Sequence, residues 1–256
     1  MQTSDNTILI TGGGSGIGRG LAEAFHQLGN SVIIAGRGRD KLDETVAANP
    51  GIEAMTFDIG QPDDIERFAG EVVAKFPKLN VVINNAGIMR NEDVKTGELK
   101  TAEATIATNL LGPIRLTAAL LPHLLRQPRA AVMTVTSGLA YVPLFITPTY
   151  SATKAAIHSY TLSLREQLKD TAVEVIELIP PYVQTHLQGA QQANDPNAMP
   201  LDDYIRETMD LLTSKPDAGE IVVGRVERQR HAAERGQFDE VFEFTCDLGR
   251  KRLAAT

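Results

Sequence analysis

Short apolar runs that alternate with helix-period segments constrain the fold of this chain more than any other feature. The runs lie at residues 7–10, 31–35, 54–57, 79–83, 131–135, 173–178 and 221–223. Between them, apolar residues recur at helical spacing, as at Ile65, Phe68 and Val72. Strands that alternate with helices pair in a parallel sheet that helices cover on both faces. The sequence therefore predicts an α/β protein, a three-layer domain with a mostly parallel, seven-stranded sheet.

No repeat or low-complexity linker divides the chain, so we expect one domain over residues 1–256. The composition changes clearly only at residues 188–200, which are polar, small and rich in helix breakers. A helical pattern with Ile205, Met209 and Leu212 follows. We interpret residues 186–215 as a surface loop with a short helix that forms a lid.

The composition argues against nucleic-acid, membrane and metal-binding classes of protein. The net charge of -7 offers no basic field for a polyanion. No run of roughly 18 apolar residues and no secretory signal is present, so we expect a soluble, cytoplasmic protein. The histidines are scattered, and the single cysteine, Cys246, cannot form an internal disulfide, so we expect no metal site and no disulfide framework.

A glycine-rich turn, TGGGSGIG at residues 11–18, joins the first strand to the first helix. Gly12 allows a tight turn, Gly16 lets backbone amides approach a pyrophosphate, and Gly18 lets the helix pack close to the strand. The positive end of the helix dipole then faces the phosphates. The predicted dinucleotide contacts in this turn are Gly12, Gly14, Ser15, Gly16, Ile17 and Gly18.

Residues after the next strands complete the predicted dinucleotide site. Where such folds carry an acid for the adenosine ribose, this chain has Arg37, whose guanidinium can bind a 2′-phosphate bidentately. The alternative is that Arg37 and Arg39 are ordinary solvated charges. Ligands bind at the carboxyl ends of parallel strands, which adds five contacts: Asp58, Ile59, Asn85, Ala86 and Gly87. We therefore expect NADP(H) as the preferred cofactor, with NAD(H) not excluded.

Tyr150 and Lys154 lie four residues apart at the start of an amphipathic helix, which places the phenol and the ammonium on one face. A nearby cation favours the phenolate and lowers a tyrosine pKa from its usual value of about 10. Ser137 ends the fifth strand, at the sheet edge that carries the glycine turn, and Asn109 lies in a helical stretch over residues 103–125. Each feature alone fits a surface helix, a helix cap or a structural amide.

Together, TGGGSGIG, NNAG at residues 84–87, Asn109, Ser137 and YSATK at residues 150–154 resemble the short-chain dehydrogenase/reductase family, over residues 7–185. The resemblance implies a Rossmann-type domain, a dimer or tetramer, and an oxidoreductase that interconverts a carbonyl and an alcohol. Tyr150 would be the general acid/base and Ser137 would polarise the carbonyl. Lys154 would bind the nicotinamide ribose and lower the tyrosine pKa, and Asn109 would hold a relay water. The implied nicotinamide-side contacts are Tyr150, Lys154, Pro180, Val183 and Thr185.

The chain departs from the family pattern in two places. Pro181 stands where many relatives have glycine, and because proline lacks a backbone donor, the nicotinamide-side loop is expected to differ. Ser15 stands where NADP-preferring members often have a basic residue, which weakens the NADP preference without reversing it. The IPP motif at residues 179–181 and the tail at residues 235–242 resemble a branch labelled DltE-like, which establishes no substrate.

Two other functions fit parts of this pattern. A sensor could register NADP(H) on the same fold without chemistry, although a pure binder needs no matched acid and cation. A sugar-nucleotide epimerase or dehydratase shares the tyrosine and the lysine, but the compact length and the glycine spacing fit it less well. The apolar stretch at residues 139–149 is consistent with a substrate-pocket wall or a subunit contact, and His186 could face a substrate. We expect a small carbonyl or alcohol substrate of apolar character.

Overall fold

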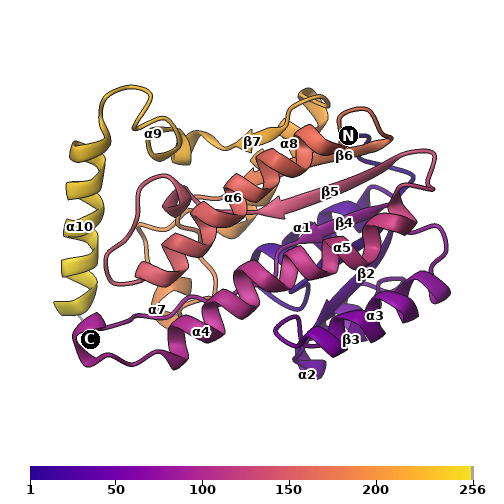
Figure 1. Ribbon diagram of the computed structural model, residues 1–256, viewed down its shortest axis with the longest axis horizontal. Helices are drawn as coiled ribbons and strands as arrows, with labels where there is room; N and C mark the ends of the chain where they lie inside the picture. The colour runs from indigo at the N-terminus through magenta and orange to yellow at the C-terminus, as the bar shows by residue number, and fades with distance from the viewer. Residues whose placement is uncertain (255–256) are drawn as a thin grey trace.

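The structure is a computed structural model that describes residues 1–254, and a single seven-stranded sheet runs through its centre (Figure 1). The strands are β1 (Thr7–Thr11), β2 (Ser31–Gly36), β3 (Glu53–Thr56), β4 (Val81–Asn84), β5 (Ala130–Val135), β6 (Val173–Ile179) and β7 (Glu220–Val222). Every pair is parallel, in the order β3-β2-β1-β4-β5-β6-β7. The predicted fold class is confirmed, and each predicted strand forms within two residues of its expected ends.

Helices cover both faces of the sheet. One face carries α3 (Pro62–Lys75), α5 (Gly112–Leu124) and α6 (Pro148–Leu168), and the other carries α1 (Gly16–Gln27), α2 (Arg39–Ala48) and α8 (Leu201–Ser214). Alternate residues of one strand supply the two cores: Leu9 of β1 faces the first set of helices, and Ile8 and Ile10 face the second. Because both faces are buried, the strands appear in the sequence as continuous apolar runs.

The helical stretch predicted over residues 103–125 forms, but it is not one regular helix. It consists of α4 (Lys100–Ile106), a π-helical turn (Ala107–Leu111) and α5. By length and composition this stretch could cross a membrane, so our expectation that no segment meets that criterion was wrong. The core helix of a soluble protein passes the same test, and here the stretch packs between α3 and α6 in the layer that covers the sheet.

Shorter elements gather at the carboxyl edge of the sheet and at the end of the chain. They are η1 (Val94–Thr96), η3 (Gly138–Ala140), α7 (Ala190–Ala193), η4 (Gly224–Val226), α9 (Glu227–Arg230) and α10 (Phe238–Ala254). Helix α10 lies at one end of the molecule, away from α3 (Figure 1). A Cβ on Gly249 would lie 2.6 Å from the Phe145 ring, so α10 packs closely on the apolar stretch that precedes α6.

Candidate active site

The glycine turn closes the space between β1 and α1 tightly. Gly12 has φ 70°, and a Cβ on Gly18 would collide with the Gly12 carbonyl oxygen, so side chains are excluded at both positions. Helix α1 begins at Gly16, and its N-cap residue Ser15 makes no side-chain cap hydrogen bond. The first amides of α1 are therefore left for a bound anion.

The loop after β4 is fixed to this turn by Thr11. The Thr11 hydroxyl accepts hydrogen bonds from the backbone amides of Asn85 and Ala86, both at 3.0 Å. The Asn85 side chain donates to the Thr11 carbonyl oxygen at 2.9 Å. The glycine turn and the loop after β4, both predicted to contact the cofactor, are thus held together by hydrogen bonds.

A cleft of about 1240 Å³ leads from the glycine turn to Tyr150, and a hollow of about 680 Å³ extends it to the ends of β2 and β3. The predicted cofactor residues that line these spaces are Gly12, Gly14, Ser15, Gly16, Ile17, Arg37, Ile59, Asn85, Ala86, Gly87, Tyr150, Lys154, Pro180 and Thr185. Gly18 and Asp58 do not line them. Asp58 instead accepts a hydrogen bond from the Gly60 amide at 2.9 Å, and Val183 lines a neighbouring pocket.

The sequence analysis missed Lys41, which lines both parts of the cleft beside Arg37. A Cβ on Gly14 would lie 3.2 Å from the Lys41 Cβ, so the lysine stands next to the glycine turn. Its position one turn after Arg37, at the start of a helix that follows a strand, was the signal available in the sequence. Arg39 pairs instead with Asp43 at 2.9 Å.

Ser137, Tyr150 and Lys154 converge at the inner end of the cleft, and all three are buried. Ser137 follows β5, where its hydroxyl accepts a hydrogen bond from the Leu139 amide at 3.1 Å and bonds to the Tyr150 hydroxyl. The Lys154 ammonium lies 5.6 Å from the Tyr150 ring centroid and donates to the Val135 carbonyl oxygen at 2.7 Å. The cap interpretation of Ser137 is thus also correct, because the same hydroxyl caps η3.

Burial shapes the proton affinities of this group. It raises the pKa of Tyr150 to about 12, and the hydrogen bond to Ser137 opposes that rise. It lowers the pKa of Lys154 to about 8, and the charge of Glu177 opposes that fall. That hydrogen bond is the interaction that lowers the pKa of Tyr150 here, and the predicted role of Lys154 in lowering it stays a prediction.

Asn109 lies in the π turn and binds the loop after β4. Its Oδ1 accepts a hydrogen bond from the Ile88 amide at 2.9 Å, and its Nδ2 donates to the Ile88 carbonyl oxygen at 2.8 Å. Nδ2 also lies 3.4 Å from the Thr153 hydroxyl of α6. This side chain therefore positions the loop after β4 against α6, and both its Oδ1 and its Nδ2 are engaged in doing so.

Glu92 caps the helix that carries Tyr150 and Lys154. Its carboxylate accepts from the Thr149 amide at 3.1 Å and from the Thr149 hydroxyl at 2.7 Å. The N-cap residue of α6, Thr147, makes no side-chain cap hydrogen bond, so the distant carboxylate supplies it. No spacing in the sequence identifies a cap that comes from 57 residues away.

An apolar pocket of about 700 Å³ adjoins the cleft at Tyr150, which lines both spaces. Most of its exposed surface is apolar and comes from residues that include Met89, Leu139, Leu144, Pro181, Leu187 and Leu248, while Gln192, Gln229 and Arg252 add polar groups. Pro181, the departure noted in the sequence, thus contributes apolar surface. Gln192 of α7 donates to the Val183 carbonyl oxygen at 2.8 Å and to the Thr185 hydroxyl at 3.1 Å, which ties the segment after β6 to the cleft. His186 lines the cofactor cleft rather than this pocket.

Comparison with known proteins adds three findings. The family model described as short chain dehydrogenase matches residues 6–196. The chain is 42% identical over 250 residues to the uncharacterized oxidoreductase DltE of Bacillus subtilis (strain 168), covering 95% of this chain and 97% of that protein. It shares its fold with a short chain dehydrogenase/reductase of Burkholderia phymatum solved with NAD (TM-score 0.81, 20% identity, 96% and 97% coverage). It also shares it with a short-chain dehydrogenase of Sphingobium yanoikuyae solved with NADPH (TM-score 0.80, 23% identity, 93% and 95% coverage).

Proposed function

Because this chain belongs to the short-chain dehydrogenase/reductase family, in its DltE-like branch, we propose that it is an NADP(H)-dependent oxidoreductase that interconverts a carbonyl and a secondary alcohol. The family match and the DltE relative support an oxidoreductase, and the neighbours solved with NADP+ and with NADH support a nicotinamide site in this fold. The preference for NADP(H), the substrate class and the roles of individual residues are the proposal.

One observation carries the proposal: Tyr150 lies where the polar cofactor cleft and the apolar pocket meet. A carbonyl carbon held in the pocket would face a nicotinamide held in the cleft, with the phenol hydroxyl and the Ser137 hydroxyl both at its oxygen. Bound NADPH supplies the hydride. Protonated Tyr150, favoured by a pKa of about 12, gives its proton to the developing alkoxide, and Ser137 orients the oxygen. The Lys154 cation stabilises the phenolate that remains.

Replacing Tyr150 with Phe tests this role directly. Without the proton donor we expect kcat to fall by about 10³-fold, with NADPH affinity nearly unchanged. Turnover is measured as NADPH oxidation over a panel of apolar ketones and aldehydes, and affinity by fluorescence titration. Tyr160→Phe, on the same helix but outside both cavities, is the matched control and keeps full activity. Undiminished turnover in Y150F would remove Tyr150 from the mechanism.

A sensor function is the second candidate. It would be favoured if the wild-type protein bound NADPH tightly and oxidised none of it with any carbonyl in the panel. The buried hydroxyl pair and cation argue against it, since a protein that only binds a dinucleotide gains nothing from holding them in a dry pocket.

The preference for NADP(H) is supported by charge at the end of β2. Arg37 and Lys41 line the hollow there, and no carboxylate of the described residues lines it with them. Two cations favour a 2′-phosphate, and a carboxylate at this position would favour a free ribose hydroxyl. The related folds solved with NAD and with NADPH allow either cofactor, so the preference rests on these two side chains.

The proposal also covers the domain organisation, the oligomeric state and the partners of the protein. We propose one domain over residues 1–256 with a lid at residues 186–215. The lid is supported by the hydrogen bond from Gln188 to Asn91 at 3.3 Å, since their neighbours Leu187 and Arg90 both line the cleft. We propose a cytoplasmic homodimer or homotetramer that acts on a small carbonyl or alcohol, without nucleic-acid or membrane partners.

A further inference from the structure

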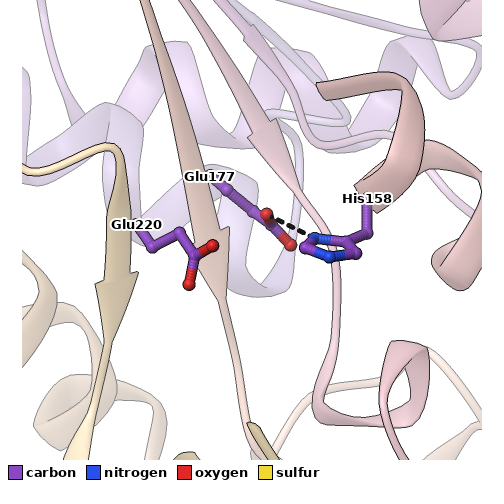
Figure 2. A group of neighbouring side chains, drawn as sticks. All are labelled: His158, Glu177 and Glu220. Carbon is purple, nitrogen blue, oxygen red and sulfur yellow. Dashed lines mark hydrogen bonds and ion pairs between the residues drawn. The ribbon is translucent and has the colours of Figure 1, made fainter. Parts of the chain in front are cut away.

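Behind Lys154 lies a charged cluster that the proposed chemistry does not use. Its centre is Glu177 of β6, whose exposed fraction is 0%, with His158 of α6 and Glu220 of β7 beside it (Figure 2). A carboxylate in the middle of a parallel sheet is unfavourable unless hydrogen bonds and opposite charges compensate it. The groups around Glu177 provide such hydrogen bonds and charges.

Three side chains from three segments hold the Glu177 carboxylate. Oε1 accepts hydrogen bonds from the Thr136 hydroxyl at 2.6 Å and from the Tyr141 hydroxyl at 3.1 Å. Oε2 is hydrogen-bonded to His158 Nδ1 at 2.8 Å, the bond drawn in Figure 2. The side chain is therefore fixed in one position, with its negative charge directed at the layer between the sheet and α6.

Two of the residues that hold Glu177, His158 and Thr136, are also close to Lys154 along the chain or through its hydrogen bond. His158 follows Lys154 by one turn of α6, so both point to the same side of the helix. The ammonium of Lys154 donates to the carbonyl oxygen of Val135, and the next residue, Thr136, donates to Glu177. Glu177 is the charge that raises the pKa of Lys154 against the effect of burial.

The other charged groups nearby are already matched to each other. Glu220 stands opposite Glu177 in the register of β6 and β7, and Arg230 of α9 donates to its two carboxylate oxygens at 2.8 and 3.3 Å. Arg230 also pairs with Glu234 at 2.7 Å. Arg230 therefore compensates the charge of Glu220. The charge of Glu177 is not compensated by Arg230, and it interacts with His158 and Lys154.

A metal site is the rival interpretation, since atoms of His158, Glu177 and Glu220 that could bind an ion lie within 4.8 Å of one another. Arg230 argues against it, because its guanidinium already engages both oxygens of Glu220. A divalent cation would have to displace that guanidinium and would then lie beside it.

We propose that Glu177, held by Thr136, Tyr141 and His158, is a positioning residue that keeps Lys154 charged beside Tyr150. Its effect on turnover rests on the proposed function. Its effect on the protonation of Lys154 does not, so the two can be tested separately.

The first test measures Lys154 itself. In protein carrying 15N-lysine, the side-chain nitrogen resonance of Lys154 is assigned with the variant Lys154→Arg and titrated with pH. Glu177→Gln keeps the shape of the side chain and removes its charge. The midpoint of the Lys154 titration should therefore move down by about one pH unit. Glu174→Gln, on the same strand but with an exposed side chain, should leave it unchanged. An unchanged midpoint in E177Q, or an equal shift in E174Q, would overturn the proposal.

The second test measures catalysis. Because Lys154 loses its proton at lower pH in E177Q, the high-pH limb of kcat/KM should move down by the same amount, with kcat at low pH largely kept. A uniform loss of activity at every pH would indicate a structural role only and would overturn the proposal. If wild-type protein turns over no substrate, the proposed function fails while the nitrogen titration still decides the role of Glu177.

Two further measurements cover a misfolded E177Q variant and a bound metal ion. Tyr141→Phe removes one of the donors that fix the carboxylate in place, so the Glu177 charge is held less firmly near Lys154 and a smaller downward shift is expected, even if E177Q does not fold. Elemental analysis should find no stoichiometric metal, and treatment with a chelator should leave the Lys154 titration unchanged. A stoichiometric metal whose removal moved that titration would replace this proposal with the metal site.

Discussion

At the scale of single residues, the proposed preference for NADP(H) depends on the side chains at the end of β2. Arg37 and Lys41 face the hollow, whereas Arg39 is held by Asp43. A charge-assisted hydrogen bond to phosphate contributes about 2 kcal/mol, so we expect Arg37→Ala to weaken NADPH binding by about 30-fold and Lys41→Ala by less. NADH binding should be unaffected in both variants, because NADH lacks the phosphate.

Fluorescence titration of each variant with both cofactors checks this prediction. Arg39→Ala removes an equally exposed arginine from the same turn and serves as the control, with both affinities unchanged. Equal losses for NADPH and NADH in R37A would mean that the arginine holds the loop rather than a phosphate.

The same scale shows which site residues a sequence can and cannot reveal. The convergence of Tyr150, Lys154 and Ser137 could be predicted only from the three together, because helical spacing places the first two on one face and Ser137 follows a strand at the edge that carries the glycine turn. The role of Glu177 could not be predicted, since this residue lies inside an apolar strand and its partners come from the residue after β5, the segment after η3 and α6. Only the pairing of β5 with β6 brings those groups together.

At the scale of elements, helix α6, which carries Tyr150 and Lys154, depends on a cap from another segment. Glu92 supplies the carboxylate that α6 lacks at its own N-terminus. Loss of a helix cap costs about 1 kcal/mol, so Glu92→Ala should lower the free energy of unfolding by that amount. Because Tyr150 lies one residue beyond the capped Thr149, we also expect kcat to fall.

A second capped helix provides the control for this prediction. Glu98 accepts hydrogen bonds from the Lys100 and Thr101 amides at the start of α4, which carries none of the three converging side chains. Glu98→Ala should cost similar stability in chemical denaturation and leave kcat unchanged. If E98A lowered kcat as much as E92A, general destabilisation would explain both effects.

The sequence predicted where helices form, but it did not predict the π turn that interrupts one of them. Apolar periodicity located α3, α6 and α8 because their buried stripes face the sheet. The π turn within residues 100–124 has no such signal, since it depends on how Asn109 meets Ile88 and Thr153 from other segments. The turn therefore belongs to tertiary packing, as π turns at functional sites commonly do.

At the scale of the whole molecule, one outer face is suited to contact with a second copy. Helices α5 and α6 lie in the same layer over the sheet (Figure 1), where α6 packs against α4 and the π turn. The π turn, α5 and α6 expose small or apolar residues: Leu111, Ala118, Ala119, Ala152, Ala155 and Leu162. Small side chains let helices approach closely, and an apolar patch on a face of this kind marks an association surface. The polar residues that flank α2 on the opposite side offer no comparable surface.

We therefore expect the proposed homo-oligomer to form through α5 and α6. Ala155→Arg places a bulky charge in the centre of that face, so sedimentation velocity should show a shift from oligomer to monomer at micromolar protein. Ala47→Arg, an equally exposed alanine on α2, should leave the oligomer intact. Because α6 also carries Tyr150 and Lys154, loss of the contact should loosen the catalytic helix and lower kcat in A155R more than in A47R. An oligomer that survives A155R would move the subunit contact elsewhere, with α10 and its exposed Phe244 as the next surface to test.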